Sequence, residues 1–130
     1  MLKTFGLSKA ERIKSKLEFE LVYNKGNTLY SNSRKLKAIF YIYTSENSSS
    51  KVAFAVFKKA GNAVWRNRVK RLLREIYRTN KYLILDSLKN KSILLVFSLN
   101  SVSQKTHPQI YINDLRVDML NLMTKIGNEF

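Results

Sequence analysis

The first helix of the chain is predicted from a capping pattern and a short apolar stripe. Ser15 and Glu18 have the spacing of a capping box, in which the Ser15 side chain caps the helix and Glu18 reaches back to it. Leu17 and Leu21 are four residues apart and therefore share one helix face. Gly26 is a plausible C-terminal stop. The pattern indicates a short helix of about Ser15 to Asn24.

Alternation with a period of two predicts the strands. Residues 36–43 alternate cleanly between an apolar face and an unusually aromatic one, and residues 52–57 alternate between bulky side chains and alanines. Residues 93–97 are continuously apolar, which is consistent with a buried central strand. A weaker strand is expected at residues 27–31, and the polar residues 46–50 are interpreted as a hairpin connection.

Two further helices are predicted from apolar positions three and four residues apart. One spans roughly Asn62 to Arg78, with Asn62 as its N-cap, and the other spans about Ile110 to Ile126. Their apolar stripes contain Trp65, Val69, Leu72, Leu73 and Ile76 in the first, and Leu115, Met119, Leu122 and Ile126 in the second. The order helix, strands, helix, strand, helix favours an α+β fold in which helices cover one layer of sheet.

Length and composition limit the class of protein. A chain of 130 residues fits one domain, which we expect to span residues 1–130 with a short flexible N-terminus of about residues 1–12. Apolar residues make up 45% of the sequence, which favours a folded globule over a disordered basic tail. No apolar run approaches the roughly 20 residues of a membrane span, and the start lacks the apolar block of a signal peptide. There is no cysteine, which excludes disulfides and thiolate metal sites, and we expect a cytoplasmic location.

Charge narrows the picture further. The 24 basic and 9 acidic residues give a formal net charge of +15, which predicts a polyanionic partner: nucleic acid, an anionic membrane surface or an acidic protein. Between Lys51 and Lys81 there are ten Lys or Arg residues and one acid, Glu75. The charge is therefore a patch rather than an even coating.

Most of this patch falls on the predicted helix from Asn62 to Arg78. Its arginines can pair with phosphate through two hydrogen bonds, which a lysine that only improves solubility need not do. A plain solvated face is the alternative, although such faces usually alternate in sign. A helix lying on a membrane would need apolar residues to insert, and here the apolar stripe is required for the core. Contact with nucleic acid is favoured.

The same residues resemble the signature of a known family. The run from Phe57 to Glu75 reads FKKAGNAVWRNRVKRLLRE, similar to the pattern KK-x-G-x-A-V-x-R-N-R-x-K-R-x-x-R-E of the bacterial ribonuclease P protein component. That family also has a phenylalanine on a short N-terminal helix, and the run from Leu17 to Tyr23 reads LEFELVY. The match covers about 20 consecutive positions, and the length and element order agree.

The resemblance implies a fold and a function. The fold is α+β: a two-layer α/β sandwich with a central mixed four-stranded sheet and three helices, in the order αβββαβα, with an unusual left-handed βαβ crossover. The function is that of the protein subunit of ribonuclease P, which binds a catalytic RNA subunit and the 5′ leader of precursor tRNA and assists removal of that leader. The RNA subunit performs the hydrolysis with Mg²⁺, so the resemblance implies no catalytic residue, cofactor or metal site in the protein, no membrane and no obligate protein partner. The residues expected to contact the RNA subunit are Lys58, Lys59, Asn62, Arg66, Asn67, Arg68, Lys70, Arg71 and Arg74.

A second site is predicted where aromatic residues gather. Phe19 and Tyr23 share a helix face, and Ile39 and Tyr41 share a strand face. If these faces meet, they form a groove suited to stacking unpaired bases, and the resemblance implies that the leader binds there. Phe57 departs from the small polar residue usual at its position in the family, and it either adds a stacking surface or crowds the leader. The alternative is that these aromatic residues are plain core.

Other classes of protein are less favoured by the sequence. A nuclease acting without RNA would need clustered carboxylates or histidines, and the acids here are scattered. Asp114 and Asp118 could hold a cation weakly, but they are expected to be surface residues near a helix N-terminus. His107 is assigned no role. The remaining alternatives are a structural RNA-binding protein of the ribosome and an architectural DNA-binding module, both compatible with composition alone.

Overall fold

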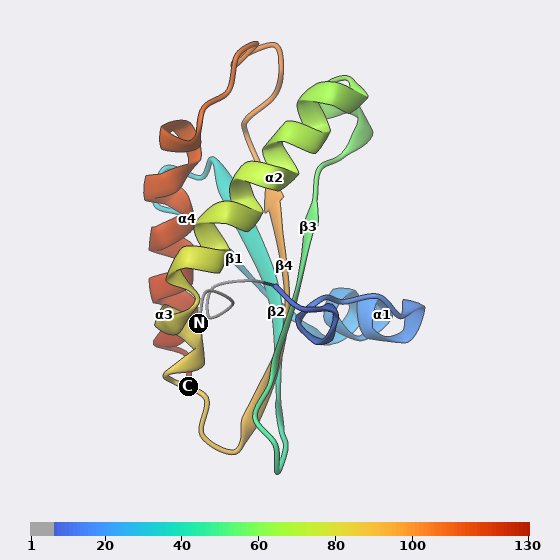
Figure 1. Ribbon diagram of the computed structural model, residues 1–130, viewed down its shortest axis with the longest axis vertical. Coiled ribbons are helices and arrows are strands. Elements are labelled where there is room, and N and C mark those ends of the chain that lie inside the picture. The colour runs from blue at the N-terminus through green and yellow to red at the C-terminus, as the bar shows by residue number, and fades with distance from the viewer. Residues whose placement is uncertain (1–6) are drawn as a thin grey trace.

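A four-stranded mixed sheet forms the centre of the computed structural model, which describes residues 7–130 (Figure 1). The strands are β1 (Asn27–Tyr30), β2 (Leu36–Thr44), β3 (Ser50–Ala55) and β4 (Lys91–Leu99), and they lie in the order β1-β2-β4-β3. β2 pairs antiparallel with both β1 and β4, whereas β3 pairs parallel with β4. The buried run that we predicted as a central strand is confirmed as part of β4.

The helices lie on both faces of this sheet (Figure 1). α2 (Ala63–Asn80), the short α3 (Tyr82–Leu85) and α4 (Ile112–Gly127) cover one face, and α1 (Lys16–Lys25) lies against the other. The α+β class, the four-stranded mixed sheet and the three main helices are confirmed. The sequence did not predict α3. The parallel pair of β3 and β4 is joined through α2 and α3, and the left-handed sense of that crossover stays a prediction.

Two cores of unequal size fill the space between sheet and helices. The larger core lies under α2 and α4 and includes Trp65, Phe97 and Leu115. The smaller one lies under α1 and contains Ile13, Val22, Leu94 and Val96, with partly buried aromatic side chains packed around it. Burial of apolar surface on both faces explains why the sheet is stable as the middle layer.

The connection between β2 and β3 is not the hairpin that residues 46–50 suggested. β4 lies between these two strands, so they are not neighbours in the sheet. The loop would be polar whether β2 and β3 formed a hairpin or were separated by another strand. Only the long-range pairing of β4 with β2 and β3 decides between these two arrangements. The local sequence therefore predicted the wrong neighbour for β2 and β3 in the sheet.

The first helix differs in detail from its predicted pattern. Ser15 caps it by accepting a hydrogen bond from the Glu18 backbone amide at 3.0 Å, and Gly26 ends it. The Glu18 carboxylate does not reach back to Ser15; it pairs with Lys51 of β3 at 2.7 Å, and this bond raises the pKa of Lys51. Leu17 is exposed rather than part of the apolar stripe. The cap was predicted correctly and the partner of Glu18 was not.

Part of the segment predicted as a flexible N-terminus packs against the domain. Residues 1–6 lie outside the described part of the chain. Lys9–Glu11 form a 3₁₀ turn, and Glu11 pairs with Lys81 at 2.9 Å. Arg12 forms a bridge with Val52 of β3. Residues 9–12 are therefore held to the sheet edge.

Within residues 7–130, none of the helices combines the length and apolarity needed to cross a membrane.

Candidate nucleic-acid interface

α2 is held in place by its cap and by its buried side. The Asn62 side chain accepts a hydrogen bond from the Trp65 backbone amide at 2.9 Å, which confirms the predicted N-cap. Trp65, Val69 and Leu73 are buried against the sheet and α4. Tyr77 is buried as well, one residue beyond the predicted stripe. These contacts fix the rotation of α2 about its axis and so determine which side chains face solvent.

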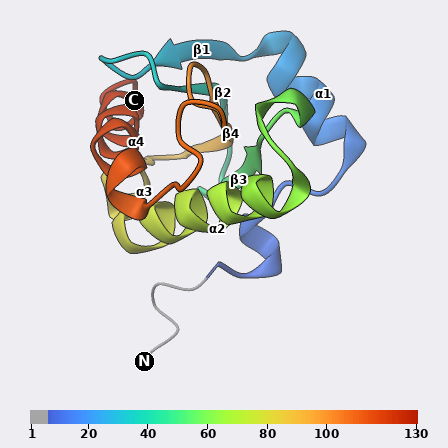
Figure 2. The ribbon, with the colours of Figure 1, turned by 90° about the horizontal axis from the view of Figure 1, so that it is seen from above.

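The segment between β4 and α4 runs beside α2 and anchors its N-terminal half (Figure 2). The Asn62 amide donates to Gln104 Oε1 at 2.9 Å. Three residues further on, the Trp65 indole donates to the His107 carbonyl at 2.8 Å. Another three residues on, Arg68 Nε donates to the Ile110 carbonyl at 2.7 Å. His107, to which the sequence assigned no role, therefore holds the Trp65 side chain through its backbone oxygen.

A close approach at the start of α2 explains the glycine in the family pattern. A Cβ atom at Gly61 would lie 2.7 Å from the Trp65 ring and 2.8 Å from the Gln104 side-chain oxygen. Such distances are too short for real contacts, so a side chain at position 61 would force the Trp65 ring and the Gln104 side chain to shift. Gly61 is required by packing.

Arg66 and Arg68 have their guanidinium groups fixed on either side of Asn67. Arg66 Nε donates to the Gly61 carbonyl at 3.0 Å, and Arg68 Nε donates to the Ile110 carbonyl. Among residues 7–130 the terminal nitrogens of both arginines have no hydrogen-bond partner, and Asn67 between them is exposed. Because Nε already holds each guanidinium group in place, its two terminal nitrogens can donate hydrogen bonds to a phosphate with less loss of side-chain entropy.

The rest of the predicted RNA-contacting set lies on the same exposed side. Lys58 and Lys59 are exposed in a 3₁₀ turn that leads into α2. Arg71 and Arg74 are exposed, and Lys70 is half-buried. The one acid, Glu75, pairs with Arg78 at 2.5 Å, and this hydrogen bond lowers the pKa of Glu75. The structure thus brings together all nine residues of the predicted set on and around one helix.

An open groove of about 320 Å³ lies on the opposite face of the sheet, at the C-terminal end of α1. Tyr23, Ile39 and Phe57 all line it, so three of the predicted leader-contacting residues meet there. Ala55 and Ser98 are neighbours in the sheet, and their small side chains leave the space that forms the groove. Both Tyr23 and Phe57 are 50% exposed, so their rings are available to a ligand.

Phe19 and Tyr41 lie next to the groove rather than in its lining. The Phe19 and Tyr23 rings are stacked with centroids 6.5 Å apart. Tyr41 stacks on Tyr43 at 5.8 Å, and both pack on the smaller core under α1. Phe19 and Tyr41 therefore pack on the smaller core, and their contact with the leader stays a prediction.

The groove also contains polar residues that the sequence did not identify. Lys37, Ser98 and Asn100 contribute to its lining. Lys37 lies on the same strand face as Ile39, so the alternation of β2 contained the signal. Ser98 and Asn100 lie beyond the predicted end of the central strand, which β4 exceeds by two residues at that end. Ser98 and Asn100 were missed because the predicted central strand ended at residue 97.

Comparison with known proteins shows the family to which the chain belongs. The family model for ribonuclease P matches residues 7–126. The chain belongs to the ribonuclease P protein family.

Individual relatives match over most of their length. The ribonuclease P protein component of Clostridium novyi (strain NT) is 38% identical over 106 residues, covering 80% of this chain and 87% of that protein. The corresponding protein of Clostridium botulinum (strain Langeland) is 36% identical over 120 residues, or 92% and 96% of the two chains. The solved RNase P protein of Thermotoga maritima has a TM-score of 0.67 at 26% identity, covering 89% of this chain and 97% of that one. The Staphylococcus aureus protein has a TM-score of 0.65 at 26% identity over 93% and 92%.

Family membership confirms the role in tRNA processing that the resemblance implied. The chain is a subunit of ribonuclease P, a nuclease of tRNA processing, and nothing supports the ribosomal alternative.

The two acids considered as a cation site have structural partners instead. Asp118 is buried and accepts a hydrogen bond from the Ser33 hydroxyl at 2.7 Å, which ties α4 to the turn between β1 and β2. Asp114 accepts from the Tyr111 backbone amide at 2.7 Å, at the start of α4. Within residues 7–130, no group of three or more Asp, Glu or His side chains is placed to hold a metal ion.

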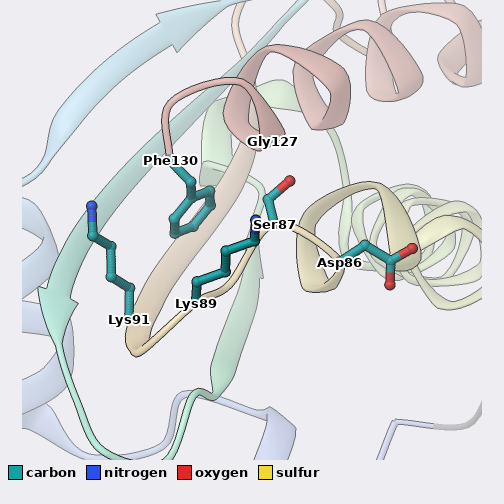
Figure 3. Close-up of a pocket in the computed structure, with 6 residues that line it drawn as sticks. All are labelled: Asp86, Ser87, Lys89, Lys91, Gly127 and Phe130. Carbon is teal, nitrogen blue, oxygen red and sulfur yellow. The ribbon is translucent and has the colours of Figure 1, made fainter.

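A further cavity lies away from both predicted sites (Figure 3). It has a volume of about 370 Å³ and lies where α3, the start of β4 and the end of α4 meet. Lys89 and Lys91 border it on either side of the Phe130 ring (Figure 3). Its lysines are exposed cations outside the predicted RNA-contacting set, which makes them useful as controls.

Proposed function

We propose that α2 docks the chain on the catalytic RNA subunit of ribonuclease P, while the groove under α1 receives the 5′ leader of precursor tRNA. The observation that carries the first half is the fixed pair of guanidinium groups of Arg66 and Arg68 around the exposed Asn67. Their free nitrogens match the two oxygens of a phosphate. Around them lie further cations and a single acid, so an RNA backbone meets little repulsion.

The RNA subunit performs the phosphodiester hydrolysis in this proposal, with Mg²⁺ bound to RNA. The protein contributes binding energy and position, since its neighbouring cations offset the charge that builds up when two RNAs come together. The assignment of the chemistry to RNA rests on the family resemblance. A cytoplasmic location and the lack of an obligate protein partner stay predictions.

The groove suits a single strand for a different reason. Tyr23 and Phe57 offer half-exposed rings on which bases can stack, whatever the sequence of the leader. Lys37 adds one cation for the backbone. In this proposal Phe57, which lines the groove and is 50% exposed, supplies a stacking surface to the leader.

Cleavage of a precursor tRNA by a bacterial ribonuclease P RNA tests this function. At low magnesium, addition of the protein should raise the cleavage rate at the mature 5′ end. A precursor with a leader of one nucleotide is the matched substrate, because it cannot reach along the groove and should gain less. Equal rates with and without protein for both substrates would contradict the proposal.

A further inference from the structure

A small pocket flanks α2 on the side that faces α4. It has a volume of about 310 Å³ and is lined by Arg68 and the residues from Pro108 to Tyr111. Three features meet there: a guanidinium group, an aromatic ring and the edge of the segment that anchors α2. The Arg68 guanidinium carbon lies 5.9 Å from the centre of the Tyr111 ring.

Both functional groups of the pocket are fixed before any ligand arrives. Arg68 is held through Nε by the Ile110 carbonyl. Tyr111 is held at both ends, since its backbone amide donates to Asp114 at 2.7 Å and its hydroxyl donates to Gln109 at 2.8 Å. Even so, Tyr111 is 55% exposed. A large ring that is fixed but left in solvent contributes little to the core and presents a ready surface to a partner.

We propose that this pocket binds one unpaired nucleotide of the RNA subunit, with the base stacked on Tyr111 and a backbone phosphate on the terminal nitrogens of Arg68. The chemistry that favours RNA is the combination of a guanidinium fork for phosphate with an aromatic face for a base. An exposed tyrosine alone would not select RNA, but this one borders a helix face on which the other charged groups are almost all cationic.

The position of the pocket selects the RNA subunit rather than the leader. The pocket is continuous with the cationic face of α2, because Arg68 belongs to both. The leader groove is lined by Tyr23 of α1, and α1 lies on the opposite face of the sheet from α2 (Figure 1). The inference rests on the proposed docking of α2 and adds to it a contact from outside the helix.

Substitution of Tyr111 in the full-length chain tests the pocket. Tyr111→Ala removes the ring, whereas Tyr111→Phe keeps the ring and loses the hydroxyl. Tyr82→Ala is the matched control, since Tyr82 is 52% exposed and lies on α3, beyond the C-terminal end of α2. Equilibrium binding to a bacterial ribonuclease P RNA would be measured at one salt concentration, with thermal unfolding of each variant as a check on folding.

The expected result is at least about a fivefold rise in Kd for Tyr111→Ala, because the loss of one base–aromatic stack costs that much or more. Tyr111→Phe and Tyr82→Ala should bind as the unsubstituted chain does. A photoreactive side chain introduced at position 111 should cross-link to the RNA subunit.

Three other outcomes would overturn the inference, and together they distinguish its failure from failure of the proposed function. If Tyr111→Ala binds normally while Arg66→Ala binds weakly, α2 docks the RNA and the pocket is empty. If Arg66→Ala also binds normally, the docking of α2 itself is wrong. If Tyr111→Ala weakens only the binding of precursor tRNA to the holoenzyme, the nucleotide belongs to the precursor and not to the RNA subunit.

Discussion

The cationic face of α2 and the groove under α1 are built in opposite ways. The face is a single helix whose exposed side chains are neighbours in sequence, and it stands on the larger of the two cores. The groove collects Tyr23, Ile39, Phe57 and Asn100 from segments far apart in the chain, above a core of four buried residues in the described part of the protein. The cationic face therefore belongs to one continuous segment on the larger core, whereas the groove is formed by separate segments over the smaller core.

This difference has a physical consequence for binding. Contacts between arginine and phosphate release counterions, so their strength falls as salt rises. Stacking of bases on tyrosine and phenylalanine buries apolar surface and depends much less on salt. The two sites can therefore be separated by their salt dependence as well as by mutation.

The largest effect is expected from removing two cations of the α2 face. Arg66→Ala together with Arg71→Ala should weaken binding to the RNA subunit by about 100-fold or more at low salt, since each charged hydrogen bond contributes about 1.5–3 kcal/mol. The slope of log K against log salt should fall by about two. Filter binding across a salt series measures both quantities.

The matched control removes two cations elsewhere. Lys89→Ala with Lys91→Ala changes the net charge equally, but these lysines border the cavity at the other end of α2 (Figure 3). That variant should lose little affinity. If both double variants lost affinity alike, binding would depend on net charge and not on the α2 face.

The support under α2 should weaken at high pH because of Tyr77. Burial raises the pKa of Tyr77 to about 12, although a hydrogen bond with Ser50 at 3.0 Å opposes part of that rise. An unfolded tyrosine ionises near pH 10, so the stability from a neutral Tyr77 is complete below pH 10 and is lost as pH rises toward 12. The loss should amount to roughly 2–3 kcal/mol in the free energy of unfolding.

Urea unfolding followed by the fluorescence of Trp65, the single tryptophan, would measure this loss. Tyr77→Phe should flatten the decline above pH 10, at a cost of about 1 kcal/mol at neutral pH for the lost hydrogen bond. Tyr82→Phe changes an exposed tyrosine and should leave the decline as it is. An equal decline in the Tyr77→Phe chain would show that other groups cause it.

The contrast between the two sites also explains what the sequence could predict. The cap at Asn62, the buried stripe and the cationic face of α2 follow from helical spacing within one segment, and all were found. Residues 46–50 were misread because the position of β4 between β2 and β3 is a long-range choice. Asn100 was missed because the predicted central strand ended at residue 97. Lys37 shares a strand face with Ile39, but that face becomes part of a groove only when separate segments meet. The anchoring of Arg68 by Ile110 also links distant segments, and no local pattern reveals it.

The smallest of the three effects is expected in the groove, where Tyr23→Ala should weaken leader binding by about fivefold or more through the loss of one stacking surface. Tyr23 is the better choice than Phe19, because half of its side chain is exposed and its removal disturbs the smaller core less. Tyr23→Phe is the matched control and should bind normally if the ring, rather than the hydroxyl, contacts the leader.

The measurement is the affinity of the holoenzyme for precursors with a long leader and with a one-nucleotide leader. The loss should appear only with the long leader, should persist at high salt, and should leave the affinity for the RNA subunit unchanged. A loss that disappeared as salt rose would mean that the groove binds by charge, through Lys37, and that the two sites differ in place but not in chemistry.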